Sequence, residues 1–149
     1  MRVPLRVIAA WCFVAVSFSG CGGGSGAGLD GNGRPLGEGD DPNGPLTASF
    51  SSIQAHIFTP ICSVCHAGAS APQGLRLDAT NSYSLLVNVP SREEPGIKRV
   101  APGDPDNSYL IQKLEGHAAA GNRMPYGGPY LDEATIAQIR LWITNGAAQ

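Results

Sequence analysis

Charged residues are scarce in this chain: they make up 15% of its 149 residues, and the formal net charge is only −2. A weak acidic balance without a basic stripe offers nothing for a polyanion to follow, so we expect no nucleic-acid partner. A long apolar run is also lacking at the N-terminus. The run 7–18 has 12 residues, whereas a helix that spans a bilayer needs about 20. These shortages exclude nucleic-acid binding and a membrane-spanning helix over 7–18.

Strands, repeats and a second pair of cysteines are missing as well. No segment shows a convincing alternation of apolar and polar residues, which is typical of a strand, and no internal repeat is visible. Cysteine occurs four times, and only Cys62 and Cys65 lie in the C-terminal two thirds. A structural zinc site needs a second pair of ligands, which the region 47–149 does not offer. The composition therefore favours an all-α fold and disfavours a zinc site.

Residues 1–20 resemble a lipoprotein signal peptide. Two arginines precede the apolar run 7–18, and small residues follow it directly before Cys21. This order is typical of a secretory signal that is cut before a cysteine, whose thiol then carries lipid. Because Phe18 stands where leucine is usual, an ordinary signal peptide that leaves Cys21 free remains the alternative. The resemblance implies the outer membrane rather than the inner membrane, because Gly22 and not aspartate follows the cysteine.

The next segment, 21–46, is predicted to be a disordered linker that begins with the lipidated cysteine. Positions 22–46 contain ten glycines and three prolines and only a few large apolar side chains. Such a segment cannot bury enough surface to offset the entropy of ordering it. The region that remains, 47–149, has the length of one small domain.

Apolar residues at helical spacing predict four helices in this domain. Prolines, glycines and capping residues mark where each helix begins and ends. The expected helices are 49–59, stopped by Pro60; 82–87; one that starts at Asp104 and Pro105 and ends before Gly116; and one that starts at Asp132 and ends at Gly146.

The motif Cys62-Ser63-Val64-Cys65-His66 carries the chemistry. Two thiols separated by two residues can each add to one vinyl group of a haem, and the adjacent histidine can then bind the iron as proximal ligand. A thioredoxin-like redox pair needs a βαβ context, which this helical sequence lacks. A local disulfide is the remaining alternative. The motif predicts one covalent haem c held by Cys62, Cys65 and His66.

The second axial ligand is expected to be Met124. The chain has two methionines, and the first one leaves with the signal peptide. Met124 lies in a polar, glycine-rich loop where it has little packing role, and its thioether is a soft iron ligand that raises the haem potential. His117 and His56 are the competitors. We expect His117 to be an exposed loop residue and His56 to be a solvent-facing residue of the first helix.

Residues 50–149 resemble a class I cytochrome c domain, in particular the cytochrome-c-like modules of lipoproteins and large exported proteins of myxobacteria and planctomycetes. The resemblance implies a small helical fold around one haem. It also implies that the first and last helices cross near Trp142 and that Met124 faces His66 across the iron. It rests on the haem motif and on the order of short pieces: His56–Cys62, Gly74–Asp78, Pro102–Pro105 with Ser108 and Leu110, Met124-Pro125 with Leu131, and Ile139 with Trp142–Ile143 and Gly146-Ala147.

A haem with two side-chain ligands has no open site for a substrate, so we expect an electron carrier and not an enzyme. The expected partners are a redox protein and, through the lipid, the periplasmic side of a membrane. Two alternatives stay open. One is a haem enzyme or sensor with five-coordinate iron, in which His117 is the candidate acid–base group. The other is an interaction module whose haem is structural. Arg76, Arg99 and Arg123 are candidate partners of the haem propionates.

Overall fold

The structure, a computed structural model, describes residues 44–149. The expected signal peptide 1–20, the lipidation site Cys21 and most of the linker 21–46 lie outside these residues. Within 44–149 every regular element is helical, and pairing between extended segments is limited to three isolated bridges. The all-α expectation is confirmed at this level. No helix in the described part is long and apolar enough to cross a membrane.

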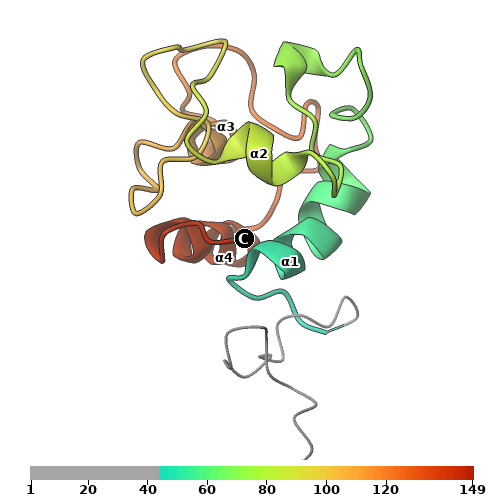
Figure 1. Cartoon of the computed structure of the whole chain (residues 1–149), viewed down its shortest axis with the longest axis vertical. Helices are drawn as coiled ribbons and strands as arrows, with labels where there is room; N and C mark the ends of the chain where they lie inside the picture. Colours follow the sequence, from blue (N-terminus) through green and yellow to red (C-terminus); the bar gives the residue numbers. More distant parts are fainter. Residues whose placement is uncertain (1–43) are drawn as a thin grey trace, which may run out of the picture.

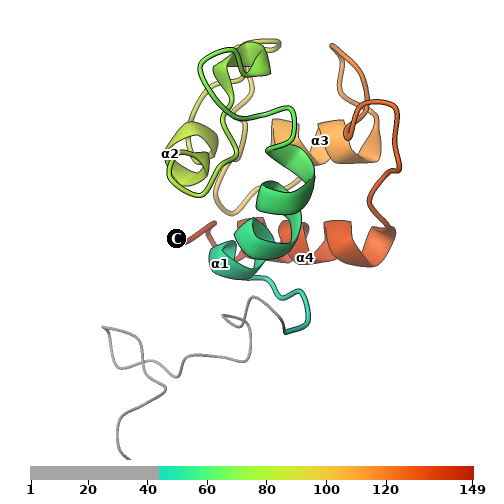
Figure 2. The ribbon, with the colours of Figure 1, turned by 90° about the vertical axis from the view of Figure 1, so that its right-hand side faces the viewer.

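Short helices joined by long loops make up the domain. Figures 1 and 2 show α4 beside α1 in the lower half of the domain, with α2 and α3 above them. The elements in chain order are α1 (Phe50–Ile53), the π-helix η2 (Gln54–Cys62), the 3₁₀ turn η3 (Pro72–Gly74), α2 (Ser82–Leu86), α3 (Tyr109–Glu115) and α4 (Glu133–Thr144).

The sequence predicted that the first helix stops at Pro60. In the structure the helix instead continues through η2 to Cys62. The helix widens here: the N–H of Ser63 donates to the carbonyl of Phe58, five residues back, at 2.8 Å. The Ser63 hydroxyl donates to the Thr59 carbonyl at 2.6 Å. Because the wider register shifts the hydrogen bonds by one residue, the helix accommodates a proline that has no N–H to donate.

Other predicted boundaries are confirmed by their capping groups. The Ser49 hydroxyl accepts the N–H of Ser52 at 3.2 Å and caps α1. Asp132 caps α4 by accepting the N–H of Thr135 at 2.7 Å, and this hydrogen bond lowers the pKa of the Asp132 carboxyl group. Gly116 follows α3 with a left-handed φ of 86°, a conformation that favours glycine. Local chemistry therefore defines these ends, as the sequence predicted.

The start of α3 differs from the prediction, which placed it at Asp104 and Pro105. The helix begins only after Ser108. The Asp104 carboxylate accepts the N–H of Asn107 at 3.2 Å, and the Ser108 hydroxyl donates to the Asp104 carbonyl at 2.8 Å. These side chains close a separate turn, because aspartate and serine offer backbone groups an alternative to helical bonds.

One hydrophobic core joins the first and last helices. The ring of Phe50 in α1 lies 5.7 Å from the Trp142 ring in α4 and 5.0 Å, edge-on, from the Tyr83 ring. The contact near Trp142 that the resemblance implied is therefore present. The fully buried side chains around these rings include Ile53, Phe58, Leu86, Val100, Ile111, Ile139 and Ile143.

Replacing Ile139 with alanine should lower the free energy of unfolding by about 2–5 kcal/mol, because its side chain is fully buried in α4. Leu141 on the same helix is 46% exposed, so the control Leu141→Ala should change stability by less than about 0.5 kcal/mol. Urea denaturation followed by circular dichroism measures both values. Equal losses in the two variants would contradict this placement of the core.

Candidate functional site

The end of η2 forms a tight turn around the two cysteines. The Cys62 carbonyl accepts the N–H of Cys65 at 3.2 Å and that of His66 at 2.9 Å. Cys62 is half-buried and packs against the core, whereas Cys65 is exposed, and both are free thiols. The turn therefore holds two thiols and an imidazole close together at the edge of the hydrophobic core.

A hydrogen bond fixes the orientation of His66. Its Nδ1 lies 3.1 Å from the Leu75 carbonyl. Because a carbonyl only accepts, Nδ1 carries the hydrogen, and Nε2 of the neutral ring keeps a lone pair. In the described part of the chain no hydrogen bond involves that Nε2. An Nδ1–H bond to a backbone carbonyl with Nε2 free is the arrangement found in metal-binding histidines.

The other two histidines are engaged elsewhere. Both ring nitrogens of His56 face carbonyl groups. Nδ1 lies 2.8 Å from the Ser52 carbonyl, and Nε2 lies 2.9 Å from the Gly44 carbonyl. His56 is half-buried, so the expectation of a solvent-facing residue was wrong: the chain before α1 folds back over it. His117 is exposed as expected, and its Nδ1 lies 3.6 Å from the Glu115 carboxylate. Neither histidine presents a buried free nitrogen.

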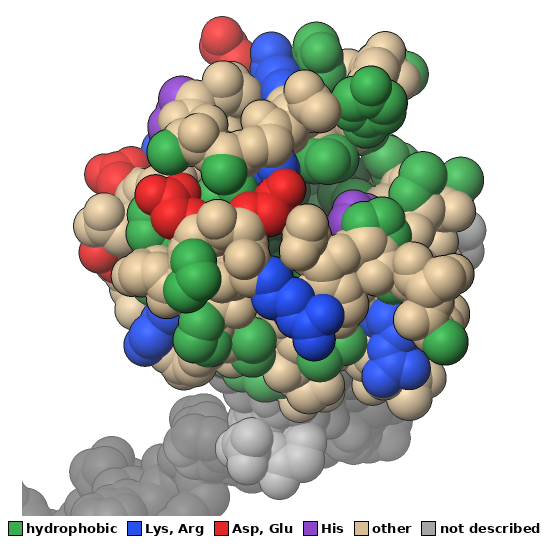
Figure 3. Space-filling model, turned by 90° about the horizontal axis from the view of Figure 1, so that it is seen from above, with side chains coloured by type: hydrophobic (Ala, Val, Ile, Leu, Met, Phe, Trp, Pro, Cys, Tyr) green, Lys and Arg blue, Asp and Glu red, His purple; other side chains and the backbone are tan. Residues whose placement is uncertain are grey.

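Met124 is half-buried and packs against the same core as Cys62 and Leu75. Its N–H donates to the Lys113 carbonyl of α3 at 2.8 Å, which ties the loop 117–130 to that helix. This loop and the cysteine turn both lie in the upper half of the molecule (Figures 1 and 2). Seen from above, this face has a hollow bordered by hydrophobic side chains and a histidine (Figure 3).

Two arginines contact the segment 73–74, which precedes the Leu75 carbonyl that binds His66. Arg99 is only 6% exposed, and its guanidinium donates to the Gln73 carbonyl at 2.7 Å and to a carbonyl of α2 at 2.8 Å. The Arg92 guanidinium lies against Gly74, where an added Cβ would come within 2.7 Å of Nη1. Burial, and then the charge of Arg92, lowers the pKa of Arg99. No carboxylate of residues 44–149 pairs with either guanidinium, so this corner fits an anionic group.

The other candidate arginines lie differently. Arg123 stacks over the Tyr130 ring, 4.1 Å from its centroid, and its Nε donates to the Leu114 carbonyl at 2.8 Å. Arg76 is half-buried and forms no ion pair within the described residues. Arg92 was missed by the sequence analysis, because an arginine in a loop without periodicity carries no signal of its own.

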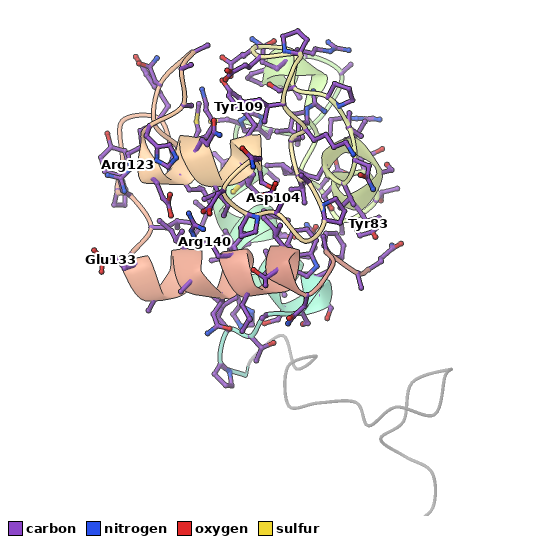
Figure 4. The ribbon with its side chains drawn as sticks, turned by 90° about the vertical axis from the view of Figure 1, so that its left-hand side faces the viewer. Tyr83, Asp104, Tyr109, Arg123, Glu133 and Arg140 are labelled. Atoms are coloured by element: carbon purple, nitrogen blue, oxygen red, sulfur yellow. The ribbon has the colours of Figure 1, made fainter. Side chains whose placement is uncertain are left out.

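A depression of about 380 Å³ lies elsewhere, between α3 and α4. Arg140 beside it forms ion pairs with Glu115 at 2.8 Å and with Asp106 at 2.7 Å. Figure 4 shows Arg140 between the two helices. The lining residues, which include no cysteine or histidine, are Glu115, Arg123, Leu131, Glu133, Ile136, Ala137 and Arg140. This depression is therefore not the candidate site.

The state of Cys62 argues against a thioredoxin-like thiol pair. Burial raises the pKa of its thiol to about 12, whereas a redox-active nucleophile needs a lowered thiol pKa. Residues 44–149 also contain no group of three or more histidine, cysteine or acidic side chains that could hold a metal ion. The residues at the site fit a haem better than either alternative: paired thiols, an oriented imidazole, a thioether on the same core and, in Arg99, a buried cation that has no carboxylate partner within residues 44–149.

No protein-family model matches this chain, and no curated protein or solved structure matches it either. The candidate site therefore rests on the residues of this chain alone. Those residues are Cys62, Cys65, His66 and Met124, with Arg92 and Arg99 beside them.

Proposed function

We propose that this chain is an electron carrier that binds one haem c covalently in a small domain of the cytochrome c type. Cys62 and Cys65 would form the two thioether bonds, and His66 and Met124 would be the axial ligands. Bound there, the haem supplies reversible one-electron transfer at its iron. The observation that carries the proposal is the state of His66, which directly follows a pair of free thiols and keeps Nε2 available.

The Leu75 carbonyl has a defined role in this proposal. By accepting from Nδ1 of His66 at 3.1 Å, it holds the imidazole in one tautomer and one orientation. Such a second hydrogen bond raises the basicity of a histidine ligand. The segment around Leu75 is itself held by Arg99, whose guanidinium donates to the neighbouring Gln73 carbonyl.

Arg99 and Arg92 would pair with the haem propionates. A guanidinium presents planar donors that match a carboxylate, and the pair is strongest where water is excluded. Arg99 is buried and Arg92 lies beside it without a carboxylate partner among the described residues. An anion at this corner would offset the cost of burying the Arg99 charge beside the exposed guanidinium of Arg92.

The surface around the site supports transient docking of a redox protein. Val64, inside the motif, is 78% exposed, and Tyr126, two residues after Met124, is 75% exposed. Ile61 adds a further exposed apolar side chain. Small apolar contacts of this kind suit weak electron-transfer encounters. Together with a lipid on Cys21, they describe a carrier tethered at the periplasmic side of a membrane, with the outer membrane favoured.

The full chain, expressed in a bacterial host that exports proteins and attaches c-type haem, tests this proposal. We expect haem that stays with the polypeptide after denaturation, a low-spin spectrum with a thioether-to-iron band, and reversible reduction. Non-covalent haem or none would refute the proposal. Covalent haem with high-spin iron would refute the electron carrier and favour the enzyme or sensor with five-coordinate iron.

A further inference from the structure

An ion pair between a buried lysine and a half-buried glutamate lies beneath the loop that carries Met124. Nζ of Lys113 in α3 is 3.0 Å from a carboxylate oxygen of Glu93, and the Lys113 side chain is only 8% exposed. The same Nζ donates to the Ala120 carbonyl at 3.2 Å. The pair thus connects three parts of the fold: α3, the loop after α2, and the loop 117–130.

Tyr109 completes this cluster. Its hydroxyl lies 3.1 Å from the Glu93 carboxylate and 2.8 Å from the Ala120 carbonyl, and its ring centroid is 5.5 Å from Nζ of Lys113. Burial, and then the hydrogen bond to Glu93, raises the pKa of Tyr109 to about 12. The hydroxyl therefore keeps its proton at neutral pH and acts as a donor to the carboxylate or to the loop.

At Gly121 the backbone of the loop lies directly against the ion pair. A Cβ added there would come within 2.6 Å of the Glu93 carboxylate and would overlap Nζ of Lys113, and the φ of Gly121 is 72°. Three residues further on, the N–H of Met124 donates to the Lys113 carbonyl at 2.8 Å. Lys113 thus holds the loop twice, once through its side chain and once through its backbone.

We propose that the Lys113–Glu93 ion pair is a clamp that keeps the loop on α3 and thereby sets how firmly Met124 stays on the iron. This inference rests on the proposed function. Lys113, Glu93 and Tyr109 are positioning residues, because they act through the loop. Removing either member leaves the other charge, buried on Lys113 or half-buried on Glu93, without its partner, and opening of the loop gives that charge more contact with water.

Added imidazole measures the clamp, because it binds the iron only after Met124 has left. Its apparent affinity therefore scales with the fraction of protein whose loop is open. In the full-length, haem-loaded protein, Lys113→Met should raise that affinity about tenfold or more, and Glu93→Gln should raise it in the same direction. The matched control is Lys98→Met, the same substitution at an exposed lysine, which should leave the affinity unchanged.

Hydrogen–deuterium exchange of the peptide 117–130 provides a readout that does not involve imidazole. Exchange in this peptide should be faster in Lys113→Met than in Lys98→Met at a temperature where both proteins are folded. Unchanged imidazole affinity in folded Lys113→Met and Glu93→Gln would overturn the clamp and leave the proposed function intact. A wild-type protein without the thioether-to-iron band would overturn the proposed function, and the clamp with it.

Discussion

Replacing both Cys62 and Cys65 with alanine should abolish covalent haem attachment completely. They are the two cysteines of the described domain, and the Cys62 carbonyl closes the turn that places Cys65 and His66 beside it. Without either thiol no thioether can form, so any haem that binds should be extracted by denaturing solvent. Mass spectrometry of the denatured chain measures the effect as the loss of the haem mass.

Single substitutions and a neighbouring control sharpen this test. Cys62→Ala and Cys65→Ala should each retain haem through one bond, in lower yield than the wild type. Ser63→Ala removes a hydroxyl from the same turn, which donates to the Thr59 carbonyl, so this control should keep the covalent haem. If the double variant still carried covalent haem, the assignment of the motif would be wrong.

Replacing Met124 with alanine should have the largest effect on the electronic properties of the protein. A thioether ligand raises the potential of a haem, and axial ligands span a range of roughly 0.8 V. We therefore expect Met124→Ala to lose the thioether-to-iron band, to become high-spin or to bind a replacement ligand, and to shift in potential by a substantial part of that range. Optical spectra and a spectroelectrochemical titration measure these changes.

Leu131→Ala provides a control for the Met124 variant, because Leu131 also packs, partly buried, against the core. It should lower stability and leave the band and the potential close to those of the wild type. A high-spin wild-type spectrum that is unchanged in Met124→Ala would show that Met124 is not a ligand. The five-coordinate alternative would then be favoured.

Helix ends could be predicted where a single side chain determines them. Ser49 and Asp132 cap their helices with their own oxygens, and Gly116 adopts a backbone conformation that suits glycine. The passage of η2 through Pro60 could not be predicted, because it depends on a change of hydrogen-bond register over several residues. The delayed start of α3 likewise reflects competition between Asp104 and the helix for the same donors.

The candidate site shows the same division. The spacing of Cys62, Cys65 and His66 is visible in the sequence, because the chemistry needs these residues close together along the chain. The partners of the site are not visible, because they are far apart in sequence. Lys113 and Glu93 meet only through folding, and the half-buried position of His56 depends on a chain segment that folds back to it.

The short length of α3 has a consequence for folding. This helix has only seven residues, too few to be stable alone in water, and its last carbonyls are satisfied by the segment that follows. The Gln112 carbonyl accepts the backbone N–H of His117 at 3.0 Å, and the Lys113 carbonyl accepts the backbone N–H of Met124 at 2.8 Å. The Leu114 carbonyl accepts from the side-chain Nε of Arg123 at 2.8 Å. Helix and loop therefore form one cooperative unit. Release of Met124 and unwinding of α3 should be a single event, so that local unfolding and loss of the proposed iron ligand share one equilibrium.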